Sequence, residues 1–294
     1  MAESSAIPAI SPWRDFWQSF SENRGAVLGL VIIVLVVLAA IFANFIAPHD
    51  PAEQFRDAVR ARPVFAGGNW THILGTDGLG RDMLSRLIYG ARMSLFIGIA
   101  VVAISCGLGI FLGLLAAGAS MAFDVVINRI IELIMAFPSL VLAVLLVAIM
   151  GPGLTSTIVA VAIGYLPAYV RLMRACAKTE LSKDYVMAAR VMGVGPWRLM
   201  LRTILPNCLA PMIVQSALGV SGALLEAAAL GFLGFGVQPP TPEWGSMLAD
   251  SREFIRSDPW IVTLPGLAIL ITVIAINLAG DGIRDALDPK LRRS

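Results

Sequence analysis

Few residues of this sequence have the types and spacing that enzymatic chemistry needs. The only histidines, His49 and His72, lie far outside the HExxH spacing of a zinc protease. The three cysteines (Cys106, Cys176 and Cys208) are far apart and form neither a CxxC pair nor a mixed Cys/His motif. We therefore expect neither a disulfide framework nor a metal site.

Two further catalytic patterns are missing or incomplete. No G-x-x-x-x-G-K-[ST] phosphate loop occurs, so the chain cannot hydrolyse ATP by that route. Residues Gly219 to Gly222 read GVSG, but no histidine follows Ser221 to act as its base. Small residues at such spacing also let helices pack closely. We expect no catalytic residue, and hence no enzyme and no cofactor bound by this chain.

Two carboxylates lie inside apolar stretches, where charge is costly and faces protein or water. Both are candidates for lining a translocation path, in which a carboxylate meets the ammonium end of a substrate. Glu132 follows Arg129 by three positions, so a helical ion pair is the alternative. Glu226 has no basic neighbour in sequence, and its alternative is a structural hydrogen bond.

The composition places these residues in a membrane protein. Hydrophobic residues make up 57% of the 294 residues and charged residues 14%, and the mean hydropathy is +0.80. A water-soluble core of this size cannot hide so much apolar surface, and a disordered chain would be poorer in it. A net charge of +2 argues against a nucleic-acid partner.

Six stretches are apolar enough to cross a bilayer, which predicts an all-α integral membrane protein with six transmembrane helices. The first is too long for a signal-peptide core and no A-x-A site follows it, so we interpret it as an uncleaved anchor. The stretches are Ala26 to Ala47, Met93 to Ala119, Val125 to Met150, Leu154 to Val170, Cys208 to Phe235 and Ile261 to Gly280.

An amphipathic helix is predicted before the first span. Trp13, Phe16, Trp17 and Phe20 follow helical spacing, and Pro12 suits the first helical position. This stripe fits either the membrane interface or packing against another subunit.

Basic residues predict the orientation. With both termini in the cytoplasm, fourteen of the 22 Lys and Arg residues, including all three Lys, lie inside. This bias favours cytoplasmic termini, although six Arg in the first outer loop weaken it.

The loop between the fourth and fifth spans predicts a helix, a turn and a second helix. Lys178 to Met192 forms the first helical stretch, residues 193–195 (GVG) break it, and Pro196 starts the second, which Leu205-Pro206 ends. A basic amphipathic loop can lie on anionic lipid. The small pair Ala188-Ala189 beside a glycine elbow favours docking into another protein.

These loop residues also resemble a known motif. Tyr185 to Gly193 (YVMAARVMG), followed by Ile204 to Asn207 (ILPN), is similar to the EAA motif of type I ABC importer permeases. Met187 stands at the Glu position and Thr203 at the Ile position. The departure at Met187 leaves no glutamate for a contact there.

The resemblance extends over nearly the whole chain, to the C-type permeases of dipeptide, oligopeptide and nickel importers. It rests on His72 to Asp82 (HILGTDGLGRD), on Ala229 to Gly234 (ALGFLG) with Pro239 to Gly245 (PPTPEWG), and on Asn277 to Pro289 (NLAGDGIRDALDP). The stretch from Pro51 to Ala58 is most similar to the dipeptide permeases.

The resemblance implies the MetI-like permease fold. It also implies a division of the chain into a cytoplasmic tail with its interfacial helix (1–25), a first transmembrane helix (26–47) and an extracytoplasmic loop (48–92). A five-helix transmembrane domain (93–286), which contains a coupling loop (176–207), and a cytoplasmic tail (287–294) follow. It implies a bacterial inner-membrane location. The implied substrate is a dipeptide, with oligopeptides, nickel, haem and glutathione as alternatives.

The resemblance also implies partners: a second permease, two ATPases that carry ATP and Mg, and an extracytoplasmic peptide-binding protein. The residues implied to couple to the ATPases are Met187, Ala188, Ala189, Gly193, Gly195, Pro196, Ile204 and Pro206. The residues implied to meet the binding protein are Asp77, Arg81, Asp82, Arg86, Glu243 and Trp244; internal pairing is the alternative for the four ionic residues of the first loop.

A secondary transporter or channel working alone is the other class of protein to consider. Such proteins often contain inverted repeats and broken helices. Pro138, Pro167 and Pro265 would allow breaks, but the sequence has no matched halves.

Overall fold

A computed structural model describes residues 12–287, so the parts of the predicted tails at 1–11 and 288–294 lie outside the described residues. No strand forms within 12–287. Five helices are long and apolar enough to cross a membrane, and a bent pair makes a sixth span if it counts as one. The predicted all-α membrane fold is confirmed. The five are α2 (Arg24–Ile41), α4 (Met83–Gly118), α7 (Leu154–Leu181), α10 (Leu205–Phe232, with the preceding turns from Pro196) and α12 (Pro259–Leu287).

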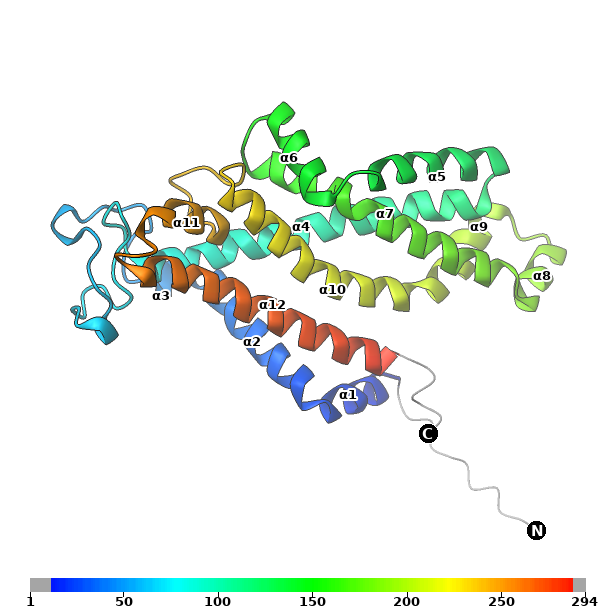
Figure 1. Cartoon of the computed structure of the whole chain (residues 1–294). Coiled ribbons are helices and arrows are strands. Elements are labelled where there is room, and N and C mark those ends of the chain that lie inside the picture. The colour runs from blue at the N-terminus through cyan, green and yellow to red at the C-terminus, as the bar shows by residue number, and fades with distance from the viewer. Residues whose placement is uncertain (1–11, 288–294) are drawn as a thin grey trace, which may run out of the picture.

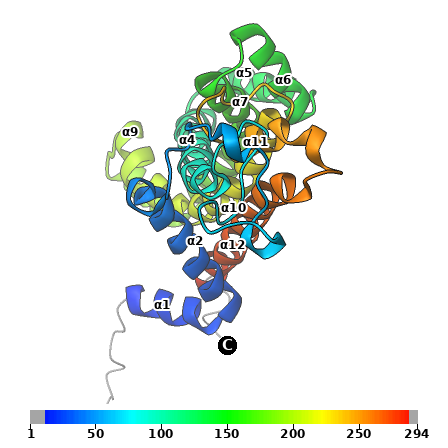
Figure 2. The same cartoon turned by 90° about the vertical axis from the view of Figure 1, so that its left-hand side faces the viewer.

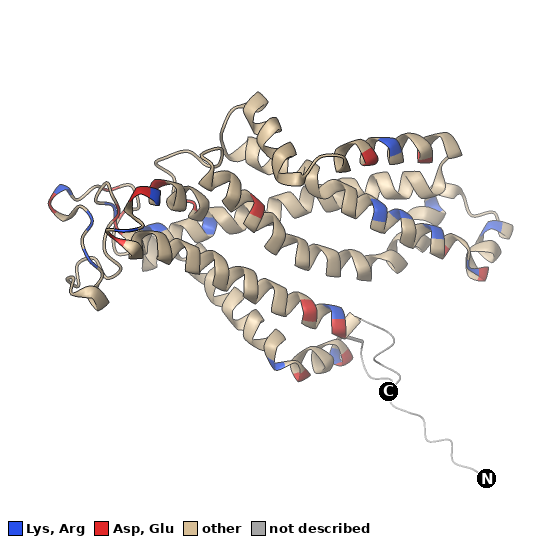
Figure 3. Ribbon diagram, viewed as in Figure 1, with Lys and Arg blue, Asp and Glu red and all other residues tan. Residues whose placement is uncertain are grey.

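The long helices run roughly side by side, and residues 47–82 form a loop-rich end of the bundle, for which we keep the name outer loop (Figure 1). α4 packs along α7, α10 contacts α4, α7 and α12, and α2 lies against α12. Seen end-on, α2 and α12 lie on one side of α4, with α5 and α6 on the other (Figure 2). Charged residues gather towards the two ends of the bundle and leave its middle largely uncharged, as a bilayer requires (Figure 3).

Several short elements lie before and between the long helices. They are α1 (Pro12–Glu22), α3 (Ala43–Ile46), η1 (Arg56–Ala58), η2 (Val64–Ala66), α11 (Trp244–Asp250) and η4 (Arg252–Phe254).

The third predicted span is broken. In place of one helix over Val125 to Met150, the structure has α5 (Met121–Met135) and α6 (Ser139–Met150), bent by 91°. Pro138 lies at the break, where its ring lacks an N–H and disfavours helical geometry at the preceding residue. Pro167 and Pro265, in contrast, lie inside α7 and α12, which continue through them.

α4 and α7 extend well beyond the apolar stretches, and charged residues in their added turns have polar partners. α4 begins at Met83, before the predicted start at Met93, and within its added turns Arg92 Nε donates to the Ala40 carbonyl at 2.9 Å. α7 continues past Val170 to Leu181.

The charges on the extended end of α7 hold α5 in place. Arg174 donates to both carboxylate oxygens of Asp124 at 2.6 and 2.8 Å, and Lys178 Nζ lies 2.6 Å from the same group. A prediction from hydropathy alone therefore ends the fourth span before these charged residues.

The aromatic stripe of α1 is divided between two environments. α1 covers the predicted aromatic stripe, and Phe20 is buried against Ala26 near Gly282 of α12. Trp13 and Trp17 remain exposed. The helix therefore packs within its own chain on one side and leaves its indole rings for lipid or a partner.

Small residues let α4 and α7 approach closely. A Cβ added at Gly109 would lie 2.3 Å from Tyr169 Cβ, whereas nothing lies within 4 Å of one added at Gly107. We expect Gly109→Ala to cost about 1–3 kcal/mol of stability through overpacking and to lower the melting temperature in detergent. Gly107→Ala, in the same helix, is the matched control and should melt like the wild type. Equal melting temperatures of the two variants would contradict this packing.

Candidate functional site

The loop between α7 and α10 forms a compact elbow at the end of the bundle opposite the outer loop (Figure 1). It contains α8 (Asp184–Val191), Gly193 and α9 (Pro196–Leu199). Gly193 has φ +80°, its N–H donates to the Arg190 carbonyl at 2.9 Å, and the Val194 N–H donates to the Ala189 carbonyl at 3.1 Å. These two bonds are the Schellman motif, which satisfies the last carbonyls of α8. The predicted glycine turn and the start of the second helix at Pro196 are confirmed. The predicted first stretch from Lys178 to Met192 is divided, because residues 178–181 end α7 and α8 begins only at Asp184.

The end of the second helix differs from the prediction. Leu205-Pro206 does not terminate it: α9 passes through a π-helical segment, η3 (Met200–Ile204), directly into α10. Pro206 falls in the first turn of α10, where its missing N–H is tolerated. The elbow is therefore continuous with a membrane-crossing helix.

The elbow exposes a large apolar surface. Val191 is 88% and Met192 76% exposed, and Met187 and Trp197 are also largely exposed. We call these four residues the elbow surface. Large apolar side chains that are exposed on a polar loop are typical of an interaction site.

The predicted coupling residues divide between this surface and its support. Ala188, Gly193, Gly195, Pro196 and Pro206 are exposed along with Met187, whereas Ala189 and Ile204 are buried and pack against the bundle core. The small residues leave open space, since nothing lies within 4 Å of a Cβ added at Gly193 or Gly195.

A polar contact that the sequence analysis missed holds α8 against the end of α7. The Tyr185 hydroxyl donates to Glu180, whose other oxygen lies 2.6 Å from Lys183 Nζ. The hydrogen bond to Glu180 raises the pKa of Tyr185 to about 12, so this tyrosine stays neutral as a donor. The sequence carried a signal for this contact, since the acidic residue is followed by a basic residue three positions later and by an aromatic residue five positions later.

The two intramembrane carboxylates lie in different environments. Glu132 is half exposed and pairs with Arg129 at 2.8 Å, which confirms the helical ion pair. Glu226 points into the protein, and its Oε1 is buried without a hydrogen-bond partner among residues 12–287. The Ser139 hydroxyl, at the start of α6, lies within hydrogen-bonding reach of the same carboxyl group.

Glu226 belongs to a polar cluster drawn from three helices. Tyr165 of α7 is close enough to interact electrostatically with it, and the Tyr165 hydroxyl lies 2.3 Å from a Cβ added at Gly222 of α10. Gly222 therefore leaves the space that the tyrosine hydroxyl fills. The bend at Pro138 brings Ser139 to this cluster, an arrangement that one straight third span would not produce.

The four ionic residues of the outer loop pair internally. Arg81 Nε lies 2.6 Å and Arg86 Nε 3.5 Å from Asp77 Oδ2, and Arg81 also reaches Asp250 at 3.1 Å. Asp82 caps α4, because its carboxylate accepts from the Ser85 N–H at 2.8 Å. All four predicted residues are buried, and three of them border a cavity of about 350 Å³.

Glu243 and Trp244, predicted to meet a binding protein, are also interior. Each is 2% exposed. Glu243 caps α11 by accepting from the Gly245 and Ser246 N–H groups, and burial raises the pKa of its carboxyl. Trp244 Nε1 donates to the Leu87 carbonyl at 3.0 Å. These residues position the outer end of the bundle, and contact with a partner stays a prediction.

The buried charges make the outer end sensitive to the loss of one of them. We expect Asp77→Asn to destabilise the chain by about 3–5 kcal/mol, since it leaves Arg81 and Arg86 short of a buried counter-charge. Thermal unfolding measures this loss, with the exposed Asp57→Asn in the same loop as control. A melting temperature equal to that of the control would show that Asp77 carries no such role.

The fold is that of ABC importer permeases. The inward-facing MetNI methionine ABC transporter superposes with a TM-score of 0.57 at 19% identity, covering 70% of this chain and 98% of that one. An amino acid ABC transporter crystallised with histidines gives 0.52 at 18% identity, covering 72% and 95%. At such identities the likeness shows the fold alone.

The sequence matches give the family. Residues 109–293 match the binding-protein-dependent transport system inner membrane component, and residues 11–63 match the N-terminal TM domain of oligopeptide transport permease C. The chain belongs to the family of binding-protein-dependent transport system inner membrane components and is a multi-pass membrane permease.

Curated relatives match over nearly their full length. The chain is 56% identical to the di/tripeptide transport system permease protein DppC of Pseudomonas aeruginosa (strain UCBPP-PA14), covering 97% of this chain and 94% of that one. It is 54% identical to the dipeptide transport system permease protein DppC of Escherichia coli (strain K12), covering 99% and 97%. The glutathione transport system permease protein GsiD of Pectobacterium atrosepticum is 41% identical, covering 96% and 92%.

Proposed function

We propose that this chain forms one half of the membrane pore of an ATP-driven importer for dipeptides. The observation that carries the proposal is the similarity, at 54–56% identity over nearly full length, to permeases named for dipeptide and di/tripeptide transport. A role in glutathione import is the second candidate, since a permease named for glutathione is 41% identical. Oligopeptide, nickel and haem import have less support.

The subunits of the proposed importer have different tasks in transport. This chain supplies membrane helices, a second permease supplies the other half of the pore, two ATPases bind ATP and Mg, and an extracytoplasmic binding protein delivers the peptide. The absence of a phosphate loop from the sequence supports the assignment of ATP hydrolysis to partners. Trp13 and Trp17 of α1 contact lipid at the interface.

In the proposal, the elbow surface docks into the ATPases. Its exposed apolar side chains and the open space beside Gly193 suit a partner cleft, and its continuity with α10 carries a movement into the membrane. Such coupling requires that the ATPase pair bind the two pore states with different free energies, because equal affinity shifts nothing.

This assignment also sets the orientation. The described ends of the chain and the elbow lie at one end of the bundle, and the outer loop lies at the other (Figure 1). Docking to cytoplasmic ATPases therefore places both termini in the cytoplasm, in agreement with the bias of basic residues. The outer end then meets the binding protein.

In the proposed pore, Glu226 binds the α-ammonium group of the peptide as it passes. A carboxylate oxygen that is buried and unpartnered among the described residues favours a cationic or hydrogen-bonding guest. Tyr165 and Ser139 supply neutral polar groups beside it.

Purification of the chain from its native membrane tests the proposal. We expect a second permease and two ATPase subunits to co-purify, and ATP hydrolysis by the complex to rise when a dipeptide-loaded binding protein is added. Recovery of a solitary chain without associated ATPase activity would contradict the proposal.

A further inference from the structure

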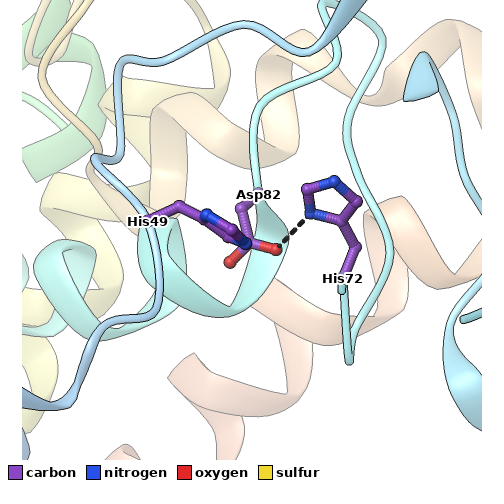
Figure 4. Close-up of side chains that lie close together, drawn as sticks. All are labelled: His49, His72 and Asp82. Carbon is purple, nitrogen blue, oxygen red and sulfur yellow. Dashed lines mark hydrogen bonds and ion pairs between the residues drawn. The ribbon is translucent and has the colours of Figure 1, made fainter. Parts of the chain in front are cut away.

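The two histidines of the chain meet an aspartate at the outer end of the bundle. His49 follows α3, His72 lies late in the outer loop, and Asp82 is the N-cap of α4. One ring nitrogen of each histidine and one carboxylate oxygen of Asp82 lie within 4.8 Å of one another. The three side chains converge in Figure 4. The spacing of the two histidines in the sequence predicted no metal site. Their imidazoles come together only through the path of the folded outer loop.

The position of Asp82 is fixed by the start of α4. Its Oδ2 accepts from the Ser85 N–H and hydroxyl, both at 2.8 Å, and its Oδ1 lies 3.0 Å from His72 Nδ1. One oxygen is thus anchored by the helix, while the other faces an imidazole. Both His72 and Asp82 are almost wholly buried. Hydrogen bonds of this kind, from neighbouring groups to a ligand side chain, orient the ligands of metal sites.

The two imidazoles are also held by their surroundings. His49 Nε2 lies 3.0 Å from the Thr71 carbonyl oxygen. The Phe55 ring packs against both histidines, with centroids 5.0 Å from His49 and 4.8 Å from His72. An aromatic wall on one side and a backbone carbonyl on the other limit the orientations of these rings. His49 is half-buried and gives the cluster access to solvent.

We propose that His49, His72 and Asp82 bind a divalent transition-metal ion, and that Zn²⁺ fits best. Two imidazole nitrogens with one carboxylate are a donor set that zinc accepts, whereas Ca²⁺ and Mg²⁺ prefer oxygen ligands. Three protein ligands leave a fourth position for water. Zinc bonds of about 2.0–2.1 Å require the three donor atoms to draw closer together, and His49 is the one ligand of the three that is not fully buried.

The bound ion would tie the two ends of the outer loop together. His49 stands near the start of the loop, and Asp82 stands at its end on the first turn of α4. A single ion would therefore link the segment after α3 to a membrane-crossing helix. Because the ion binds the folded loop and not the unfolded chain, it raises the melting temperature.

Zinc titration of the full-length chain tests the proposal. The chain is purified through a tag that contains no histidine, placed in lipid nanodiscs and stripped with a chelator. We expect one Zn²⁺ per chain with a dissociation constant in the micromolar range or tighter. His49→Phe keeps an aromatic ring beside Phe55, and His72→Asn keeps an N–H donor for Asp82. Each should weaken binding at least tenfold, whereas Asp57→Asn, an exposed carboxylate of the same loop, should bind like the wild type.

Zinc K-edge absorption of the wild-type chain gives a readout that does not depend on the folding of the variants. We expect nitrogen and oxygen ligands with the scattering signature of two imidazoles. Three results would overturn the proposal: failure of the wild type to retain stoichiometric zinc, a sulfur ligand in the absorption spectrum, or wild-type zinc affinity in both histidine variants. The contact between His72 and Asp82 would then be a structural hydrogen bond only.

Discussion

Gly193→Phe is expected to reduce ATP-driven peptide uptake to background while the chain still inserts into the membrane. Gly193 has φ +80° and is exposed, with nothing within 4 Å of an added Cβ. The left-handed conformation costs a non-glycine residue about 1–2 kcal/mol, which a folded membrane protein tolerates. The phenyl ring would instead project from the elbow into the space that the proposed ATPase contact requires.

Gly193→Ala separates backbone strain from bulk. It carries the same conformational penalty with a single methyl group, so we expect it to retain most of the uptake. Uptake and ATP hydrolysis are measured together in proteoliposomes, and the amount of inserted chain is checked by immunoblot. Uptake by the phenylalanine variant at the wild-type rate would show that the elbow does not enter a partner cleft.

Glu226→Gln is expected to lower uptake at least tenfold with little change in melting temperature. The substitution keeps the shape of the side chain but removes the charge that the proposal assigns to the peptide ammonium. A hydrogen bond to a charged group contributes about 1.5–3 kcal/mol, and each 1.4 kcal/mol of lost binding free energy corresponds to a tenfold weaker affinity.

Glu132→Gln is the matched control for this prediction. Both carboxylates lie in apolar stretches of sequence, but Glu132 is half exposed and pairs with Arg129 on the surface of α5. An exposed ion pair contributes little, so uptake should stay near the wild-type rate. Equal uptake by the wild type and the Glu226 variant would remove Glu226 from the proposed path.

The sequence predicted the helices and the elbow because both depend on local patterns. Long apolar runs have few alternatives to a membrane-crossing helix, and Gly193 followed by Pro196 marks one helix end and the next start. The extent of α4 and α7 was underestimated, because hydropathy counts Arg92 and Arg174 as charges and does not see their partners.

The parts that the sequence did not predict depend on distant contacts. The bend at Pro138 differs from the continuous paths through Pro167 and Pro265, although all three are prolines in apolar stretches. Pro167 and Pro265 are buried inside their helices, whereas Pro138 is exposed. The proximity of His49 and His72 depends on the path of the whole outer loop.

Charge alone was a poor guide to the exposure of loop residues. Asp77 and Arg81 are ionic residues of an outer loop, which suggests exposure, yet they are buried with their charges paired inside the loop. Val191 and Trp197, which are apolar, are among the exposed residues of the elbow. The charge of a loop residue therefore did not indicate whether its side chain is exposed.

Uptake of a labelled dipeptide into proteoliposomes tests the central claim most directly. The vesicles contain this chain with its co-purified subunits, ATP on the side of the elbow and binding protein on the side of the outer loop. We predict accumulation that requires ATP hydrolysis and the binding protein and that no ion gradient replaces. Accumulation driven by an ion gradient in vesicles that contain this chain alone would contradict the account.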